Sequence, residues 1–88
     1  MGNLDSVKTD VFIRFLKLLG LKEYGQKGSH VKWKKEGQLR SCVIRPSKKE
    51  IPLRHIKTNL GSIGIEIEVF EKWLSGEYKN EKIRKNFR

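Results

Sequence analysis

The chain has 88 residues, of which 36% are hydrophobic, which is enough for one small core and too little for a second. We therefore expect a single domain over residues 1–88, with a core at about residues 10–74 and a basic tail at residues 75–88. No stretch approaches the ~20 consecutive apolar residues of a membrane span, and the first residues lack the basic-then-apolar order of a signal peptide. We expect a cytoplasmic protein that has no membrane partner.

The net charge is +10, from 20 Lys and Arg against 10 Asp and Glu. Residues 27–57 hold ten of these cations and two of the acids, so this segment alone carries +8. A field of this strength on a small domain favours a polyanionic partner, most often nucleic acid, over a merely solubilising surface. The anion-binding face should therefore lie within residues 27–57.

Cysteine and histidine are too few for a disulfide or a zinc site. The chain has one cysteine, Cys42, and two histidines, His30 and His55. A structural zinc site needs four such ligands, and a disulfide needs two cysteines. We predict neither a metal site nor a cofactor.

The first predicted element is an amphipathic helix. Residues 1–8 show no strong pattern and are expected to fray. Thr9 or Asp10 can cap the helix and Gly20 can end it. Its apolar positions fall at i, i+3, i+4 and i+7, and they are Phe12, Phe15, Leu16 and Leu19. This stripe needs a surface to cover.

Three strands are predicted next, at residues 21–26, 30–34 and 39–45. The middle strand alternates, with Val31 and Trp33 on one face and His30, Lys32 and Lys34 on the other. Lys27-Gly28 and Glu36-Gly37 are predicted as its flanking turns.

The pairing of the last two strands follows from the second turn. A two-residue loop places Val31 opposite Cys42 and Trp33 opposite Arg40. Cys42 and Ile44 then join the buried face. Ser41 and Arg45 join His30 on the open one.

Pro46 ends the sheet and a charged loop follows at residues 47–50. A short helix then starts near Pro52 and ends at Gly61, with its apolar positions at Leu53, Ile56 and Leu60.

Residues 63–69 alternate like a strand, but the apolar residues from Val69 to Leu74 fit one face of a helix. We predict a helix from about Glu66 to Leu74. The basic tail beyond Gly76 has three open possibilities: it frays, extends a helix or contacts nucleic acid.

The order of these elements predicts an α+β fold of the double-stranded-RNA-binding type, α-β-β-β-α(-α). A three-stranded antiparallel sheet has helices on one face and leaves the other open. An open face that carries basic side chains tracks phosphates by shape and charge rather than by base identity.

The segment Gln26-Lys27-Gly28-Ser29-His30 resembles the HicA toxin family. The resemblance extends over about residues 10–74 and includes the Leu-Gly end of the first helix and the apolar positions of the later helices. The family consists of small ribonucleases of toxin-antitoxin pairs. The resemblance implies cleavage of messenger RNA without a metal, His30 as the catalytic residue and a HicB-type antitoxin protein as the partner.

The chemistry of such cleavage fits the residues around His30. Imidazole exchanges protons near neutral pH, and neighbouring cations favour its neutral form, so the base is the favoured role for His30. The predicted RNA-binding residues are Lys27, Gly28, Ser29, Lys32, Lys34 and Arg45. The cations would hold phosphate, Gly28 allows close approach of the backbone, and Ser29 can hydrogen-bond the ring or a phosphate. The second proton-transfer group stays open between His55, a lysine and water.

Two other functions compete with a ribonuclease. The first is an RNA-binding domain of the same fold without catalysis, because Arg45-Pro46-Ser47 stands where the family commonly has a Pro and a second His. The second is a DNA-binding regulator that uses residues 53–74 as a helix-turn-helix, which three glutamates on the last helix disfavour. Among the remaining residues, Trp33, Phe70, Trp73 and Cys42 are predicted in the core and His55 at the surface.

Overall fold

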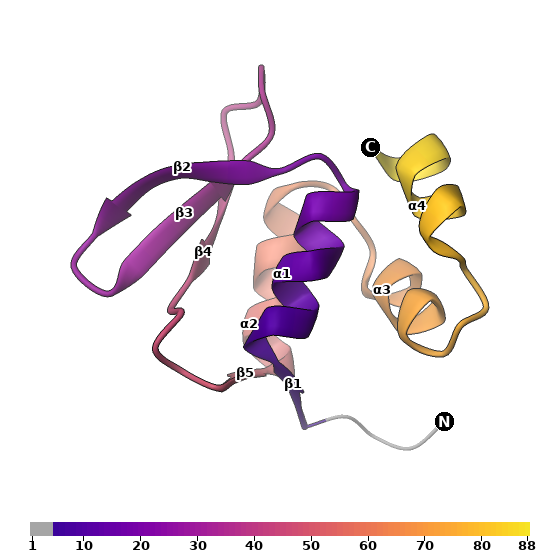
Figure 1. The fold of residues 1–88 in the computed structure, drawn as a ribbon, viewed down its shortest axis with the longest axis horizontal. Helices are drawn as coiled ribbons and strands as arrows, with labels where there is room; N and C mark the ends of the chain where they lie inside the picture. The colour runs from indigo at the N-terminus through magenta and orange to yellow at the C-terminus, as the bar shows by residue number, and fades with distance from the viewer. Residues whose placement is uncertain (1–4) are drawn as a thin grey trace.

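A computed structural model describes residues 5–88. It is an α+β structure, which confirms the predicted fold class, with a three-stranded antiparallel sheet, a second sheet of two strands, and four helices (Figure 1). In chain order the elements are β1 (Ser6–Lys8), α1 (Thr9–Leu18), β2 (Lys22–Lys27), β3 (His30–Lys34), β4 (Ser41–Ile44), β5 (Glu50–Pro52), α2 (Leu53–Ser62), α3 (Ile67–Leu74) and α4 (Asn80–Phe87).

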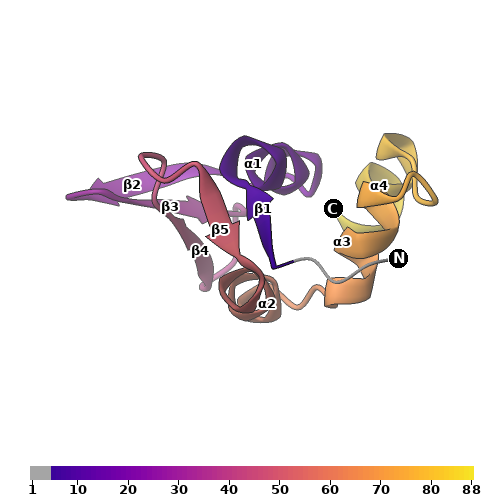
Figure 2. The ribbon, with the colours of Figure 1, turned by 90° about the horizontal axis from the view of Figure 1, so that it is seen from below.

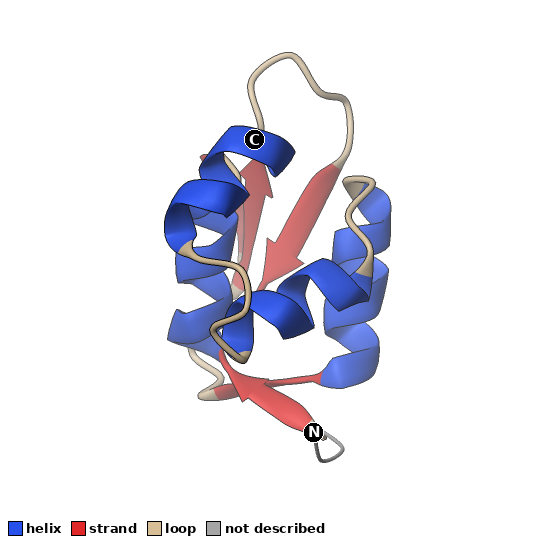
Figure 3. Cartoon of the chain, turned by 90° about the vertical axis from the view of Figure 1, so that its right-hand side faces the viewer, coloured by secondary structure: helices blue, strands red, loops and turns tan. Residues whose placement is uncertain are grey.

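The elements form layers. Helices α1 and α2 lie on one side of the β2-β3-β4 sheet, and α3 and α4 lie beyond them on the side away from the sheet (Figures 1 and 2). From the side of α3 and α4, the helices stand in front of the strands (Figure 3). No helix covers the outer face of the sheet in these views, so that face is open to a partner.

The β3–β4 pairing differs from the predicted register. Val31 pairs with Ile44 and Trp33 with Cys42, two residues away from the expected partners. The prediction was wrong because the connection runs over residues 35–40 instead of being a two-residue turn. A shift of two residues keeps every side chain on its expected face. Val31, Trp33, Cys42 and Ile44 are all buried, as predicted.

The small second sheet was not predicted. β1 pairs antiparallel with β5, with Val7 opposite Ile51, and both of these side chains are buried. The expectation that residues 1–8 fray is therefore wrong for β1, while residues 1–4 lie outside the described part. The amide of Leu53 also donates to the carbonyl of Asp5 at 3.0 Å. This pairing holds the start of α2 beside the start of α1.

Helix α1 begins at Thr9, and its N-cap residue is Lys8, with no side-chain cap. The sequence predicted Thr9 or Asp10 as the N-cap, and that prediction was wrong. The Thr9 hydroxyl instead donates to the carbonyl of Lys48 at 2.6 Å, and its amide donates to Lys49 at 2.9 Å. Thr9 is buried, and its two hydrogen bonds connect the start of α1 to the loop before β5.

Helix α2 runs past the predicted stop at Gly61, and the chain turns instead at Gly64, whose φ of +77° suits glycine. The predicted helix over residues 66–74 is confirmed as α3. The tail forms α4, and its Ile83 is fully buried. Within residues 5–88, no helix is long and apolar enough to cross a membrane.

Candidate functional site

The open face of the β2-β3-β4 sheet is strongly basic. Residues paired across antiparallel strands share a face, so Lys27 lies with His30, and Lys22 lies with Lys34. By the same argument Ser41 and Val43 join them, and Arg45 follows in the alternation of β4. We call this surface the basic face; its charged residues are Lys22, Lys27, Lys32, Lys34 and Arg45. The one acidic residue in these strands, Glu23, pairs with Trp33 and so belongs to the helix side.

The cations of the basic face are not neutralised within the protein. Among residues 5–88, one ion pair lies within 4.0 Å, between Lys72 and Glu77 at the far layer. The positive charge of the basic face is therefore available to an anionic partner.

His30 and Arg45 are in contact at one edge of the basic face. The guanidinium Nε of Arg45 donates a hydrogen bond to Nε2 of His30 at 2.9 Å. A guanidinium only donates, so Nε2 is the acceptor in this contact, and a neutral imidazole in this arrangement has its proton on Nδ1. Because β3 and β4 are adjacent, Arg45, the residue after β4, lies beside His30 at the start of β3. The lone pair of Nε2 is therefore engaged by Arg45 in this structure.

A groove opens next to this pair. It has a volume of about 560 Å³, and its lining includes His30, Arg45, Lys48, Glu50, His55 and Thr58. The prediction that His55 lies at the surface is confirmed, but the same side chain also lines the groove with His30. The single acid, Glu50, accepts a hydrogen bond from the Ser6 hydroxyl. The groove therefore combines two imidazoles with two cations, Arg45 and Lys48, from the loop that follows β4.

A protein-family model described as HicA toxin of bacterial toxin-antitoxin matches residues 10–65, which is more than half of the chain. The chain belongs to the HicA toxin family. Comparisons with curated proteins and with solved structures gave no match. The HicA family consists in general of endoribonuclease toxins that are paired with antitoxins. The matched residues contain the basic face and the groove, and they end before α3.

Asn59 fixes the position of α2 in this HicA protein. Its side-chain Oδ1 accepts from the amide of Val43 at 3.0 Å, and its Nδ2 donates to the carbonyl of Val43 at 3.3 Å. These contacts occupy the outer backbone edge of β4, which has no strand neighbour on that side. They hold α2, and with it His55, against the strand that leads to Arg45. Sequence reasoning missed this role, because an asparagine on a helix is ordinarily a solvated side chain.

Gly28 and Ser29 form the two-residue connection between β2 and β3, directly before His30. Gly28 has a φ of +61°, a conformation that glycine adopts without strain. The side-chain amide of Gln26 donates to its carbonyl at 3.1 Å. Both loop residues are exposed, so their predicted contacts with RNA remain sterically open.

Two residues that the sequence assigned to the core of the HicA fold are buried under the sheet. Trp33 is 5% exposed and Cys42 is fully buried. Burial raises the pKa of the Cys42 thiol from 9.0 to about 12, because removal from water disfavours the thiolate. The thiol donates to the carbonyl of Asn59 at 3.3 Å. Neither residue takes part in the site.

Among residues 5–88, no three His, Cys, Asp or Glu side chains lie together in a group that could hold a metal ion.

Proposed function

We propose that this protein is an endoribonuclease toxin that cleaves messenger RNA without a metal ion in the groove beside His30, with His30 as the general base. The observation that carries the proposal is the position of His30, which lies on the basic face, lines the groove and has its Nε2 against the Arg45 guanidinium. Membership of the HicA family supports the same class of activity. The five cations of the basic face supply the attraction for the RNA backbone.

In the proposed step, His30 Nε2 accepts the proton of a ribose 2′-hydroxyl and the oxygen attacks the adjacent phosphorus. The bond from phosphorus to the 5′-oxygen breaks, and that oxygen leaves with a proton from a second group. The products are a 2′,3′-cyclic phosphate and a 5′-hydroxyl, so atoms and charge balance without water. General acid and base groups of this kind contribute about 10² to 10⁴ in rate each.

His55 is our assignment for the second group. It lines the same groove as His30 from the other wall, helix α2. Its imidazolium would donate the proton to the leaving 5′-oxygen. His55 and a lysine, Lys48, both line the groove, and we prefer His55 because imidazole exchanges protons near neutral pH.

Arg45 has two partners in this scheme. In the RNA-free protein it donates to His30 Nε2 and fixes the ring. A phosphate is a stronger acceptor for a guanidinium than a neutral imidazole, so bound RNA draws Arg45 away and frees the lone pair. Arg45 then stabilises the charge that develops on phosphorus, as Lys32 does from the same face.

The antitoxin partner would act on the same surface. A HicB-type protein that lays an acidic surface over the basic face neutralises its field and excludes RNA at once. The family relation supports this pairing.

The test is RNA cleavage in the presence of EDTA. Wild-type protein should produce 2′,3′-cyclic ends, and His30→Ala should lower the rate by at least about 10²-fold. His55→Ala should also lower the cleavage rate, and by a smaller factor if water takes over the general-acid role of His55. Ser62→Ala, which removes a hydroxyl from the same helix outside the groove lining, is the matched control and should retain activity. Cleavage by His30→Ala at the wild-type rate would contradict the proposal.

A non-catalytic RNA-binding domain is the second candidate, and one observation favours it. Arg45 donates to Nε2 of His30 in this structure, so the lone pair that a general base needs is already engaged. This candidate predicts RNA binding without any cyclic ends after long incubation. Cyclic ends that depend on His30 would exclude it.

A further inference from the structure

We propose that the RNA bound by the basic face is single-stranded, and that Tyr24 is the platform on which one of its bases stacks. The inference rests on the proposed function for the identity of the ligand. It specifies that the RNA is single-stranded, and it names a residue that recognises a base of that strand.

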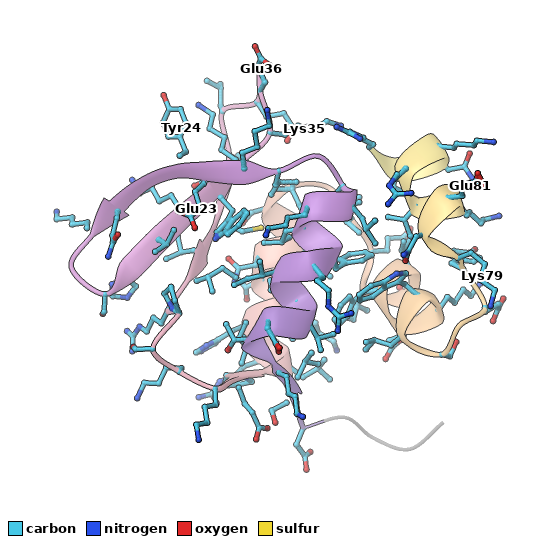
Figure 4. All side chains as sticks on the ribbon, in the orientation of Figure 1. Glu23, Tyr24, Lys35, Glu36, Lys79 and Glu81 are labelled. Atoms are coloured by element: carbon cyan, nitrogen blue, oxygen red, sulfur yellow. The ribbon has the colours of Figure 1, made fainter. Side chains whose placement is uncertain are left out.

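Tyr24 stands at an irregularity of the sheet. The register of β2 against β3 shifts between Glu23 and Gly25, which leaves Tyr24 without a cross-strand partner. Such a bulge bends the strand and redirects a side chain. Glu23 and Tyr24 point to opposite sides of β2 (Figure 4). Because Glu23 belongs to the helix side, Tyr24 lies toward the basic face, and the bulge leaves it there beside Gly25 with no β3 residue opposite.

The surroundings of the ring agree with this placement. The Lys34 ammonium lies 4.4 Å from the centre of the Tyr24 ring, and Lys34 belongs to the basic face. The contact orients the ring through a cation–π interaction. Tyr24 is nevertheless 70% exposed, so the ring remains available to a further partner. An exposed, oriented aromatic among unpaired cations is the combination that single-strand binders use.

Stacking of a base on Tyr24 requires that the RNA be single-stranded at that point. In a duplex, the faces of the bases are covered by their neighbours, so an aromatic side chain reaches them only in unpaired segments. Lys34 lies four residues along β3 from His30, which is roughly 13 Å in a strand. A base stacked on Tyr24 would therefore lie a few nucleotides from the bond that His30 attacks. This geometry fits one strand laid across β2 and β3.

Binding to a non-cleavable RNA tests this inference apart from catalysis. The probe is a fluorescent single-stranded 2′-O-methyl oligoribonucleotide, compared with a blunt duplex of the same sequence. Tyr24→Ala should weaken single-strand binding by about 5- to 150-fold, the range measured for one base stack, and Tyr24→Phe should stay within about twofold of wild type. Leu39→Ala is the matched control, because Leu39 is 96% exposed in the loop between β3 and β4 and should have no effect.

The outcomes separate this inference from the proposed function. The inference would be overturned if Tyr24→Ala bound the single strand as tightly as the wild type does. It would also be overturned if the substitution weakened binding to the duplex as much as binding to the single strand. A Tyr24→Ala protein that binds RNA normally but loses an antitoxin would also overturn it, because the ring would then serve a protein partner. A failure of cleavage with the binding pattern intact would count against the proposed function alone. Since Tyr24 makes no core contact, circular dichroism should show an unchanged fold.

Discussion

The hydrogen bond from Arg45 to His30 determines which nitrogen of the imidazole is available for chemistry. It joins residues 15 positions apart in the sequence, and it forms because β3 and β4 are neighbours in register. Alternation within each strand was enough to predict both residues on one face of the sheet. It did not predict the direct contact, because the contact depends on the pairing between strands, which was two residues in error. The catalytic role of His30 stays a prediction.

Cys42 offers a test of the core at the residue scale. Its raised pKa means that the native thiol stays neutral at pH values where a thiol in the unfolded chain ionises. The resulting contribution to stability is complete below about pH 9 and is lost as the pH rises toward about 12. The free energy of unfolding should therefore fall more between pH 8 and pH 10 in the wild type than in Cys42→Ala. Denaturant titrations at the two pH values measure this, and equal losses would contradict the burial of the thiol.

At the scale of elements, the position of α2 decides whether His55 belongs to the site. The helix was predicted from the spacing of its apolar residues, but that spacing says only that Ile56 and Leu60 face a core. The approach of α2 to the edge of β4 is set by Asn59 and by the β1–β5 sheet in front of it. Three-residue strands such as β1 and β5 are too short to show a periodic pattern. The sequence therefore predicted β4 and α2, but it predicted neither β5 nor the groove that the three elements line.

Asn59→Ala tests this arrangement. The substitution removes two hydrogen bonds to the backbone of Val43 and leaves the edge of β4 to water, so the protein should lose about 1–2 kcal/mol of stability. The midpoint of urea unfolding should fall accordingly, and RNA cleavage should fall below that of wild type under conditions where the variant is folded. Ser62→Ala is the control, because its hydroxyl donates only to the carbonyl of Thr58 within the same helix. An unchanged midpoint for Asn59→Ala would show that the edge contact does not hold α2.

At the scale of the whole molecule, the chain separates its charge from its core. The aromatic rings of Phe12, Phe15 and Phe70 pack edge to face between α1 and α3, on the side away from the sheet. The cations of β2 and β3, together with Arg45 after β4, gather on the opposite side. The sequence predicted this separation from the net charge of residues 27–57. It left the tail undecided, because Ile83 alone does not reveal that α4 packs in the outer layer.

The position of RNA on the protein tests the central claim most directly. Amide chemical shifts of the wild-type protein, recorded by NMR during titration with a non-cleavable single-stranded 2′-O-methyl oligoribonucleotide, locate the bound strand residue by residue. We expect the largest shifts along β2, β3 and β4 and around His30 and Arg45, with little change in α3 and α4. Glu81 of α4 and Lys79, the residue before that helix, lie at the far end of the molecule (Figure 4). Shifts centred on α3 and α4, with the basic face unchanged, would contradict it.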